Sequence, residues 1–132
     1  MERYLLDTMT VLWMAFEPDR LGGNAAALLE ADDTDLAYST VSLWEIGLKM
    51  GRGGYHGFHL PDQWDELIPR GLAGQGIAER SIRPADCRRL QNLPSFHKDP
   101  FDRMLIAQAL EESRSVIGCD GQFDAYGVRR IW

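Results

Sequence analysis

The sequence predicts an α/β fold in which helices cover both faces of a mainly parallel, twisted β-sheet. Short apolar segments typical of strands alternate along the chain with segments whose apolar residues recur at helical spacing. Strands that are separated by helices imply parallel crossover connections. The length of 132 residues and the apolar share of 45% suit one compact domain, so we expect a single domain over residues 1–132.

In the first half of the chain, apolar periodicity defines five elements, and turn residues separate them. An acidic turn at residues 32–35 precedes the second strand, and four glycines between residues 51 and 57 end the helix before them. The expected elements are a strand at 3–6 that ends at Asp7, helices at about 10–16 and 24–31, a strand at 36–39 and a helix from Ser42 to about Met50.

The second half continues the alternation, and its clearest helix begins at Asp99. Asp99 is a good N-cap, Pro100 suits the first helical position, and apolar residues then recur at helical spacing to about Glu112. The other expected elements are a helix at 61–72 that Pro69 interrupts, a strand at 77–82, a short helix at 84–92, and strands at 115–119 and 128–132.

Composition excludes several functional classes. No apolar run approaches the ~20 residues that a membrane span needs, and the N-terminus is too polar for a secretory signal, so we expect a cytoplasmic protein without membrane contact. Cys87 and Cys119 are expected to be reduced and structural, and the histidines at 56, 59 and 97 lack zinc-finger spacing. The net charge of -6 argues against a broad basic surface but suits an acidic pocket that holds cations.

Four acids are placed to meet at one edge of the predicted sheet. Asp7 and Asp120 follow the first and fourth expected strands, and Glu45 and Asp102 lie in the first turn of expected helices. In open α/β sheets, ligands bind at the carboxyl ends of the strands, near the switch in strand order. Converging carboxylates repel one another, and a site without His or Cys suits Mg²⁺, for which Mn²⁺ can substitute. The chemistry that this predicts is metal-assisted phosphodiester hydrolysis.

Each acid also has a purely structural interpretation, and the pattern leaves both open. A strand-end Asp such as Asp7 or Asp120 often caps a turn. Glu45 could complete a capping box with Ser42, because the two have the required spacing. Asp102 would lie in the first turn of its helix, where the helix dipole favours any acid.

Four stretches of sequence combine these acids with characteristic neighbours. They are YLLDT at 4–8, SLWEI at 42–46 with Lys49 after it, HKDPFDRMLIAQA at 97–109, and an ending that carries Asp120, Phe123, the stretch 126–128 and Trp132. In this order, and over essentially the whole chain, they resemble the motifs of PIN-domain ribonucleases, and most of all those of VapC-type toxins. The third stretch is the most specific of the four.

This resemblance implies a PIN-like three-layer α/β/α sandwich and a Mg²⁺- or Mn²⁺-dependent enzyme that cleaves RNA. It also implies a toxin role, a cognate antitoxin as partner and a homodimer. By position, Asp7 and Asp102 would be the principal metal ligands, Glu45 would bind metal or orient water, and Asp120 would act through water or on a second ion. We interpret Asp99, on nearly the same helical face as Asp102, as the helix cap.

Two residues depart from the pattern of the family that the chain resembles. Met9 stands where relatives often have His or Asn, and Gly118 where many have Ser or Thr. Neither change removes a carboxylate, so we expect metal binding to persist, while substrate positioning and rate stay open. The two departures also keep open an alternative function, a non-catalytic PIN module that acts through dimerisation or antitoxin binding.

The residues around the acids receive mostly structural interpretations. Lys49, Lys98 and Arg103 would either contact RNA phosphate or form ion pairs, and both alternatives stay open. His97 is placed outside the site, because the proposed chemistry needs no proton shuttle. Packing rather than base stacking is expected for large side chains at helical spacing, namely Trp13, Trp44, Phe101 and Met104.

Two phosphoryl-transfer classes also have an acid after the first strand, but other residues argue against them. A haloacid-dehalogenase-like phosphatase usually has a second Asp two residues later, where this chain has Met9. A response-regulator receiver has a lysine near its last strand, and no lysine follows Lys98.

Overall fold

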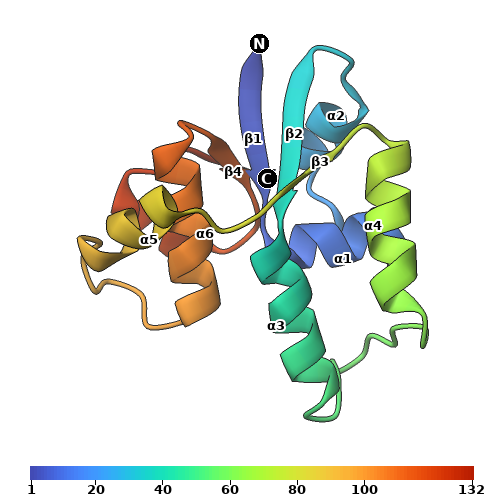
Figure 1. The fold of residues 1–132 in the computed structure, drawn as a ribbon. Coiled ribbons are helices and arrows are strands. Elements are labelled where there is room, and N and C mark those ends of the chain that lie inside the picture. Colours follow the sequence, from blue (N-terminus) through green and yellow to red (C-terminus); the bar gives the residue numbers. More distant parts are fainter.

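The computed structural model describes residues 1–132 and contains a five-stranded sheet in which every pair of neighbouring strands is parallel (Figure 1). The strands lie in the order β3-β2-β1-β4-β5. This confirms the predicted parallel sheet. The strands are β1 (Glu2–Leu6), β2 (Thr34–Ser39), β3 (Ala78–Arg80), β4 (Ser115–Ile117) and β5 (Arg130–Ile131).

The strand order switches between β1 and β4. The chain builds the sheet outward from β1 through β2 to β3, and then crosses back to add β4 and β5 on the other side. Leu6 is in register with Ile117, and the Asp7 N–H donates a 3.0 Å hydrogen bond to the Ile117 carbonyl. The carboxyl ends of β1 and β4 therefore adjoin at the place where such sheets bind ligands.

Helices cover both faces of the sheet, as predicted (Figure 1). One face carries α1 (Thr8–Phe16), α2 (Gly23–Glu30) and α4 (Trp64–Gly74). The other carries α5 (Pro84–Gln91), α6 (Pro100–Glu111) and the 3-10 helix η2 (Gly121–Tyr126). Helix α3 (Thr40–Met50) extends from the carboxyl end of β2 and packs on both layers, and η1 (Pro18–Arg20) links α1 to α2. None of the helices is both long and apolar enough to cross a membrane.

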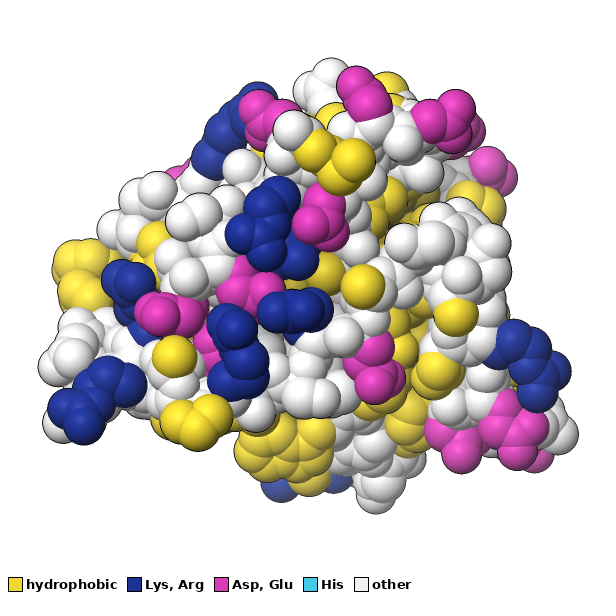
Figure 2. Space-filling model, turned by 45° about the horizontal axis from the view of Figure 1, so that its top comes forward, with side chains coloured by type: hydrophobic (Ala, Val, Ile, Leu, Met, Phe, Trp, Pro, Cys, Tyr) yellow, Lys and Arg dark blue, Asp and Glu magenta, His cyan; other side chains and the backbone are white.

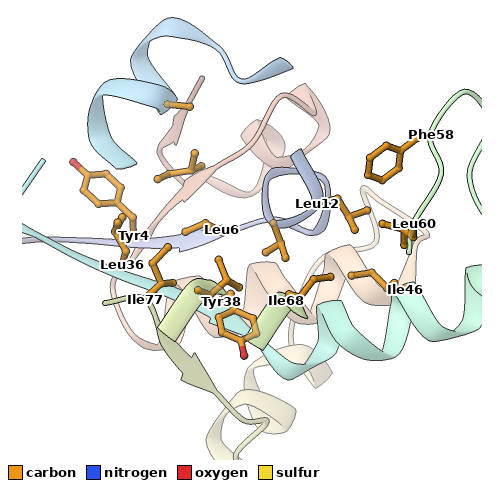
Figure 3. Close-up of a cluster of buried hydrophobic side chains, with 14 residues drawn as sticks. Tyr4, Leu6, Leu12, Leu36, Tyr38, Ile46, Phe58, Leu60, Ile68 and Ile77 are labelled. Carbon is orange, nitrogen blue, oxygen red and sulfur yellow. The ribbon is translucent and has the colours of Figure 1, made fainter. Parts of the chain in front are cut away.

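Alternation along the strands divides the core into two clusters. In β1, Tyr4 and Leu6 face the first cluster, which Figure 3 shows, and Leu5 faces the second. In β4, Ile117 faces the first cluster and Val116 the second. Because the central strands are apolar on both faces, they are buried from both sides, as parallel strands between two helical layers usually are.

Helix α3 begins earlier than predicted. The Ser39 hydroxyl accepts the Val41 N–H at 3.1 Å and caps the helix, so that Thr40 is its first residue. Glu45 therefore lies in the second turn, and the predicted first-turn position is wrong. The alternative capping box between Ser42 and Glu45 is excluded for the same reason, because Ser42 lies inside the helix.

Other boundaries also differ from the prediction. Helix α4 begins at Trp64 and continues through Pro69, where an interruption was expected, because buried Ile68 and Leu72 anchor both sides of the proline to the core. Strand β4 ends at Ile117, and β5 has only two residues.

The two cysteines, Cys87 and Cys119, are free but exposed, so they do not have the structural role that was expected.

Candidate metal centre

Asp7 is fixed at the junction of β1 and α1. It is the N-cap of α1, and its Oδ1 atom accepts hydrogen bonds from the Thr10 N–H at 2.8 Å and from the Thr10 hydroxyl at 2.6 Å. The Thr10 hydroxyl also contacts the Ile117 carbonyl at 2.8 Å, which ties this turn to the end of β4. The capping interpretation of Asp7 is thus correct, but it occupies only one carboxylate oxygen.

Gly118 leaves the space that the other oxygen of Asp7 occupies. A Cβ atom at position 118 would lie 2.7 Å from Asp7 Cγ and would also overlap Oδ2. The departure at Gly118 therefore has a physical reason, because a larger residue would displace the Asp7 side chain. Met9, the other departure, is partly buried and packs against the first core cluster.

Glu45 reaches the same region from α3. Its side chain is 6% exposed, its Oε1 accepts a hydrogen bond from the Thr8 hydroxyl at 2.8 Å, and its Oε2 accepts one from Lys49 Nζ at 2.7 Å. The Ser42 hydroxyl lies 2.9 Å from that of Thr8, so the starts of α1 and α3 are joined by polar contacts. Thr8 and Ser42 belong to the motifs noted in the sequence, but their orienting role could not be inferred from it. Lys49 forms an ion pair with Glu45, which was one of the two roles considered for it, the other being contact with RNA phosphate.

Asp102 lies in the first turn of α6 beside an unexpected neighbour. Asp99 caps this helix, because its Oδ1 accepts the N–H groups of Phe101 at 2.9 Å and Asp102 at 3.2 Å. The Asp102 side chain is instead directed to His97, whose Nε2 lies 2.8 Å from Asp102 Oδ2. His97, which was expected to lie outside the site, is thus in direct contact with one of the proposed site residues.

Asp120 joins this group from the segment after β4. One ligand atom each of His97, Asp102 and Asp120 lie within 4.8 Å of one another. Asp120 does not close the strand as predicted but caps η2, where its Oδ1 accepts the Gln122 N–H at 2.9 Å. The structure thus brings together side chains from the α5–α6 loop, the first turn of α6 and the β4–η2 segment.

Asp7 and Asp102 share an unfavourable electrostatic environment. Burial raises the pKa of Asp7 to about 6, and the charges of Asp102 and Glu45 add to this effect, although the Thr10 hydrogen bonds oppose it. Burial likewise raises the pKa of Asp102 to about 6, with Asp99 and Glu45 adding to it and the His97 hydrogen bond opposing it. A bound divalent cation would relieve this repulsion, and the carboxylate-rich donor set fits such an ion.

The other residues weighed beside the acids have mostly structural roles. Arg103 donates hydrogen bonds to the carbonyls of Leu93, Pro94 and His97, and therefore holds the loop before α6. Trp44, expected to be a core or a subunit contact, is 62% exposed and meets Phe101 edge-on, with ring centroids 4.9 Å apart, so it lies outside the core and the subunit contact stays a prediction.

The largest groove does not coincide with these acids. It has a volume of about 510 Å³ and lies between α2 and β5, where Tyr4, Asn24 and Arg129 line it. Its arginines are already paired, Arg129 with Glu2 and Arg130 with Asp124. The chemistry of the side chains, rather than the size of a cavity, therefore identifies the candidate site.

The sequence profile of the PIN domain matches residues 4–128. No curated protein matches the chain. Among solved structures, the chain is similar to the VapBC2 complex of Rickettsia felis bound to promoter DNA, with a TM-score of 0.72 and 13% identity over 98% of this chain and 97% of the other.

Two further structures show the same similarity. The DNA-bound VapBC complex of Salmonella typhimurium has a TM-score of 0.70 and 14% identity, over 99% of this chain and 98% of the other. FitAcB from Neisseria gonorrhoeae has a TM-score of 0.57 and 20% identity, over 98% and 96%. At these identities the likeness establishes a shared fold, and it extends over the full length of this chain.

Proposed function

The chain belongs to the PIN-domain family, and we propose on this premise that it is a divalent-metal-dependent endoribonuclease that hydrolyses RNA phosphodiester bonds. The observation that supports this most strongly is the gathering of acids at the switch in strand order, where Asp7 and Glu45 are buried and Asp102 is partly buried. Asp7 and Asp102 come from separate elements, and the pKa of each is raised to about 6. Such a group favours the uptake of a cation from solution.

The proposed ligands of Mg²⁺ or Mn²⁺ are Asp7 and Asp102, with Glu45 and Asp120 as the third and fourth acids. When bound, such an ion neutralises charge on the phosphate and activates water for attack. The chain itself orients the ligands. Thr10 holds Oδ1 of Asp7, and Thr8 holds Oε1 of Glu45. We propose direct attack by water, without a covalent intermediate.

Cleavage of a pool of small RNAs in Mn²⁺ tests this function. The wild-type chain should cleave RNA, and both EDTA and the Asp7→Asn variant should abolish cleavage, with a loss of at least about a hundredfold. Asp62→Asn is the matched control, because Asp62 is an exposed acid outside the centre. Cleavage that persists in Asp7→Asn, or that continues in EDTA, would contradict the proposal.

We extend the proposal to a toxin role in the cytoplasm with a protein antitoxin as partner, because the similar structures from Rickettsia felis and Salmonella typhimurium are VapBC complexes. Exposed apolar side chains, among them Trp44 and Phe96, offer surface for such a partner or for a homodimer. Growth arrest on expression, relieved by Asp7→Asn, would support the toxin role. Sedimentation equilibrium would test the homodimer.

The alternative is a non-catalytic module that binds metal and protein partners only. Met9 and Gly118 motivated this alternative, but both now have packing explanations that leave the acids intact. Tight Mn²⁺ binding and dimerisation without cleavage of any RNA in the pool would favour it.

A further inference from the structure

His97 is the side chain beside the acids that the proposed set of ligands leaves unused. It lies in the loop between α5 and α6, three residues after the carbonyl of Pro94 that Arg103 binds. Its Nε2 atom is 2.8 Å from Asp102 Oδ2, and its side chain is only 11% exposed. The imidazole therefore faces the acids rather than solvent.

The distances at His97 suit a shared ion. One atom each of His97, Asp102 and Asp120 lie within 4.8 Å of one another. Ligand atoms that bind one divalent ion from about 2.0–2.6 Å are up to about 4–5 Å apart. The three side chains could therefore meet at one ion with small adjustments, and each comes from a different segment of the chain.

The backbone of His97 is held on both sides. Its N–H donates to the Tyr126 hydroxyl at 2.8 Å, and its carbonyl accepts Arg103 Nη1 at 3.4 Å. Arg103 Nη1 also donates to the Tyr126 hydroxyl at 3.2 Å. Because Tyr126 belongs to η2, which Asp120 caps, these contacts tie the His97 loop to the segment that carries Asp120. The imidazole is thus positioned before any ion binds.

We propose that His97 is a ligand of the metal centre through Nε2, and that this nitrogen makes the centre select Mn²⁺ over Mg²⁺. The inference rests on the metal dependence proposed above and adds a ligand and a selectivity to it. Mg²⁺ is bound mainly by oxygen atoms, whereas imidazole suits transition-metal ions and raises their relative affinity. In the competing arrangement, His97 only orients Asp102 by a hydrogen bond and does not contact the ion.

Electron spin-echo envelope modulation of Mn²⁺ bound to the purified chain separates these arrangements, because it detects a nitrogen nucleus coupled to the bound ion. The chain has only three histidines, and the other two, His56 and His59, are exposed. We expect nitrogen coupling in the wild type and in the His56→Gln/His59→Gln control, and its loss in His97→Gln. Glutamine retains an N–H that can bind Asp102, so this variant removes the imidazole without removing the hydrogen bond.

The affinities give a second readout that does not depend on catalysis. In His97→Gln the affinity for Mn²⁺ should fall at least about tenfold, while the affinity for Mg²⁺ should change less than about threefold. Equal losses for both ions would overturn the selectivity.

Each outcome points to one conclusion. Mn²⁺ that binds the wild type without nitrogen coupling, or coupling that persists in His97→Gln, overturns the ligand role and leaves the proposed metal dependence standing. A wild-type chain that binds no Mn²⁺ at all overturns the proposed function itself. If His97→Gln does not fold, coupling in the control variant still assigns the nitrogen to His97.

Discussion

Two groups of buried and partly buried acids lie at opposite ends of β1 and α6, and they differ in what surrounds them. The metal centre lies at the carboxyl end of β1 and the start of α6. At the other ends of these two elements, Glu112 and Asp35 face four basic side chains. We call this group the arginine cluster, and its basic members are Arg3, Arg80, Arg83 and Arg114. Figure 2 brings the end with the start of β1 forward and shows basic and acidic side chains interleaved there.

The arginine cluster neutralises its acids internally. Arg80 Nη2 lies 2.6 Å from Glu112 Oε1, and Arg114 Nη1 lies 3.1 Å from Asp35 Oδ1. Burial alone would raise the pKa of Asp35, but the hydrogen bond and charge of Arg114, with the charge of Arg3, outweigh it and hold this pKa below its usual range. Burial therefore does not decide the charge state by itself. In the arginine cluster the chain supplies the cations, whereas in the candidate metal centre we propose that an ion from solution takes most of that role.

Glu112→Gln should remove the negative charge that pairs with the arginines of the cluster, and we expect it to have the largest effect on stability. The Glu112 side chain is 4% exposed, and its loss leaves the buried Arg114 guanidinium with fewer partners. We expect the free energy of unfolding to fall by about 3 kcal/mol in urea denaturation with EDTA. The neighbouring Glu111 is 30% exposed and pairs with Arg89, so Glu111→Gln should cost less than about 1 kcal/mol. Equal losses in the two variants would show that Glu112 stabilises the fold no more than an exposed ion pair does.

The metal centre should make the metal-free protein less stable as the pH rises. Below about pH 4, Asp7 is protonated in both the folded and the unfolded chain. Between this pH and about 6, the unfolded chain releases its proton while the folded chain keeps it, because the folded pKa is about 6. The free energy of unfolding should therefore fall with rising pH, by an amount on the order of 2–3 kcal/mol that is complete above about pH 6.

Denaturation in EDTA between pH 5 and pH 7.5 measures the upper part of this loss, about 1.4 kcal/mol for Asp7. Asp35 does not interfere, because its lowered pKa keeps it ionised throughout this range. Mn²⁺ added at pH 7.5 should restore the stability, since it binds the folded chain. A metal-free stability that stays level or rises over this range would show that the acids do not repel one another.

Asp7→Asn should stabilise the metal-free protein, in contrast to the effect of neutralising Glu112. The amide oxygen of asparagine can still accept the two hydrogen bonds from Thr10, while the buried charge is removed. We expect a gain of about 2 kcal/mol at pH 7.5 in EDTA, and a much smaller gain at pH 4. The melting temperature in a calorimeter is the measurement, with Asp62→Asn as the exposed control. A lower melting temperature in Asp7→Asn would count against a tight cluster of acids.

The sequence predicted the parallel sheet and the order of its elements better than it predicted where each element begins and ends. Apolar periodicity reports which side of an element is buried, and it located every strand and α-helix to within a few residues. Periodicity did not give the first residue of α3, and so the turn that carries Glu45, because the helix start depends on a local cap. Ser39 makes the capping hydrogen bond, and Ser42 could have made an equivalent one. The predicted interruption of α4 at Pro69 is absent, because core contacts of Ile68 and Leu72 outweigh the preference of proline to end a helix.

His97 illustrates a different limit. Its position beside Asp102 depends on Tyr126, which lies 29 residues away in the chain, and on the Arg103 contacts with the loop. No local pattern predicts such contacts, because they are set by how η2 packs against α6. The same holds for Gly118, whose lack of a side chain matters only because Asp7 lies against it.

Gly118→Ala should have the smallest effect of this series, and it tests whether the position of Asp7 matters as well as its charge. The new methyl group would overlap the Asp7 carboxylate, which would have to rotate away from the Thr10 hydrogen bonds that now fix it. We expect the affinity for Mn²⁺ to fall about tenfold, or about 1.4 kcal/mol, in a calorimetric titration. Gly71→Ala adds the same methyl group where nothing lies within 4 Å, so its affinity should equal that of the wild type.

Unchanged Mn²⁺ binding in Gly118→Ala would mean that the Asp7 carboxylate tolerates several positions around the ion. The affinity for Mn²⁺ would then depend on the number of negative charges around the ion and not on their exact positions. A tenfold loss would instead show that the metal centre resembles the arginine cluster in one respect. In both groups hydrogen bonds or ion pairs within the chain would then hold the acids in place, and the groups would differ in whether the chain or the solution supplies the opposite charge.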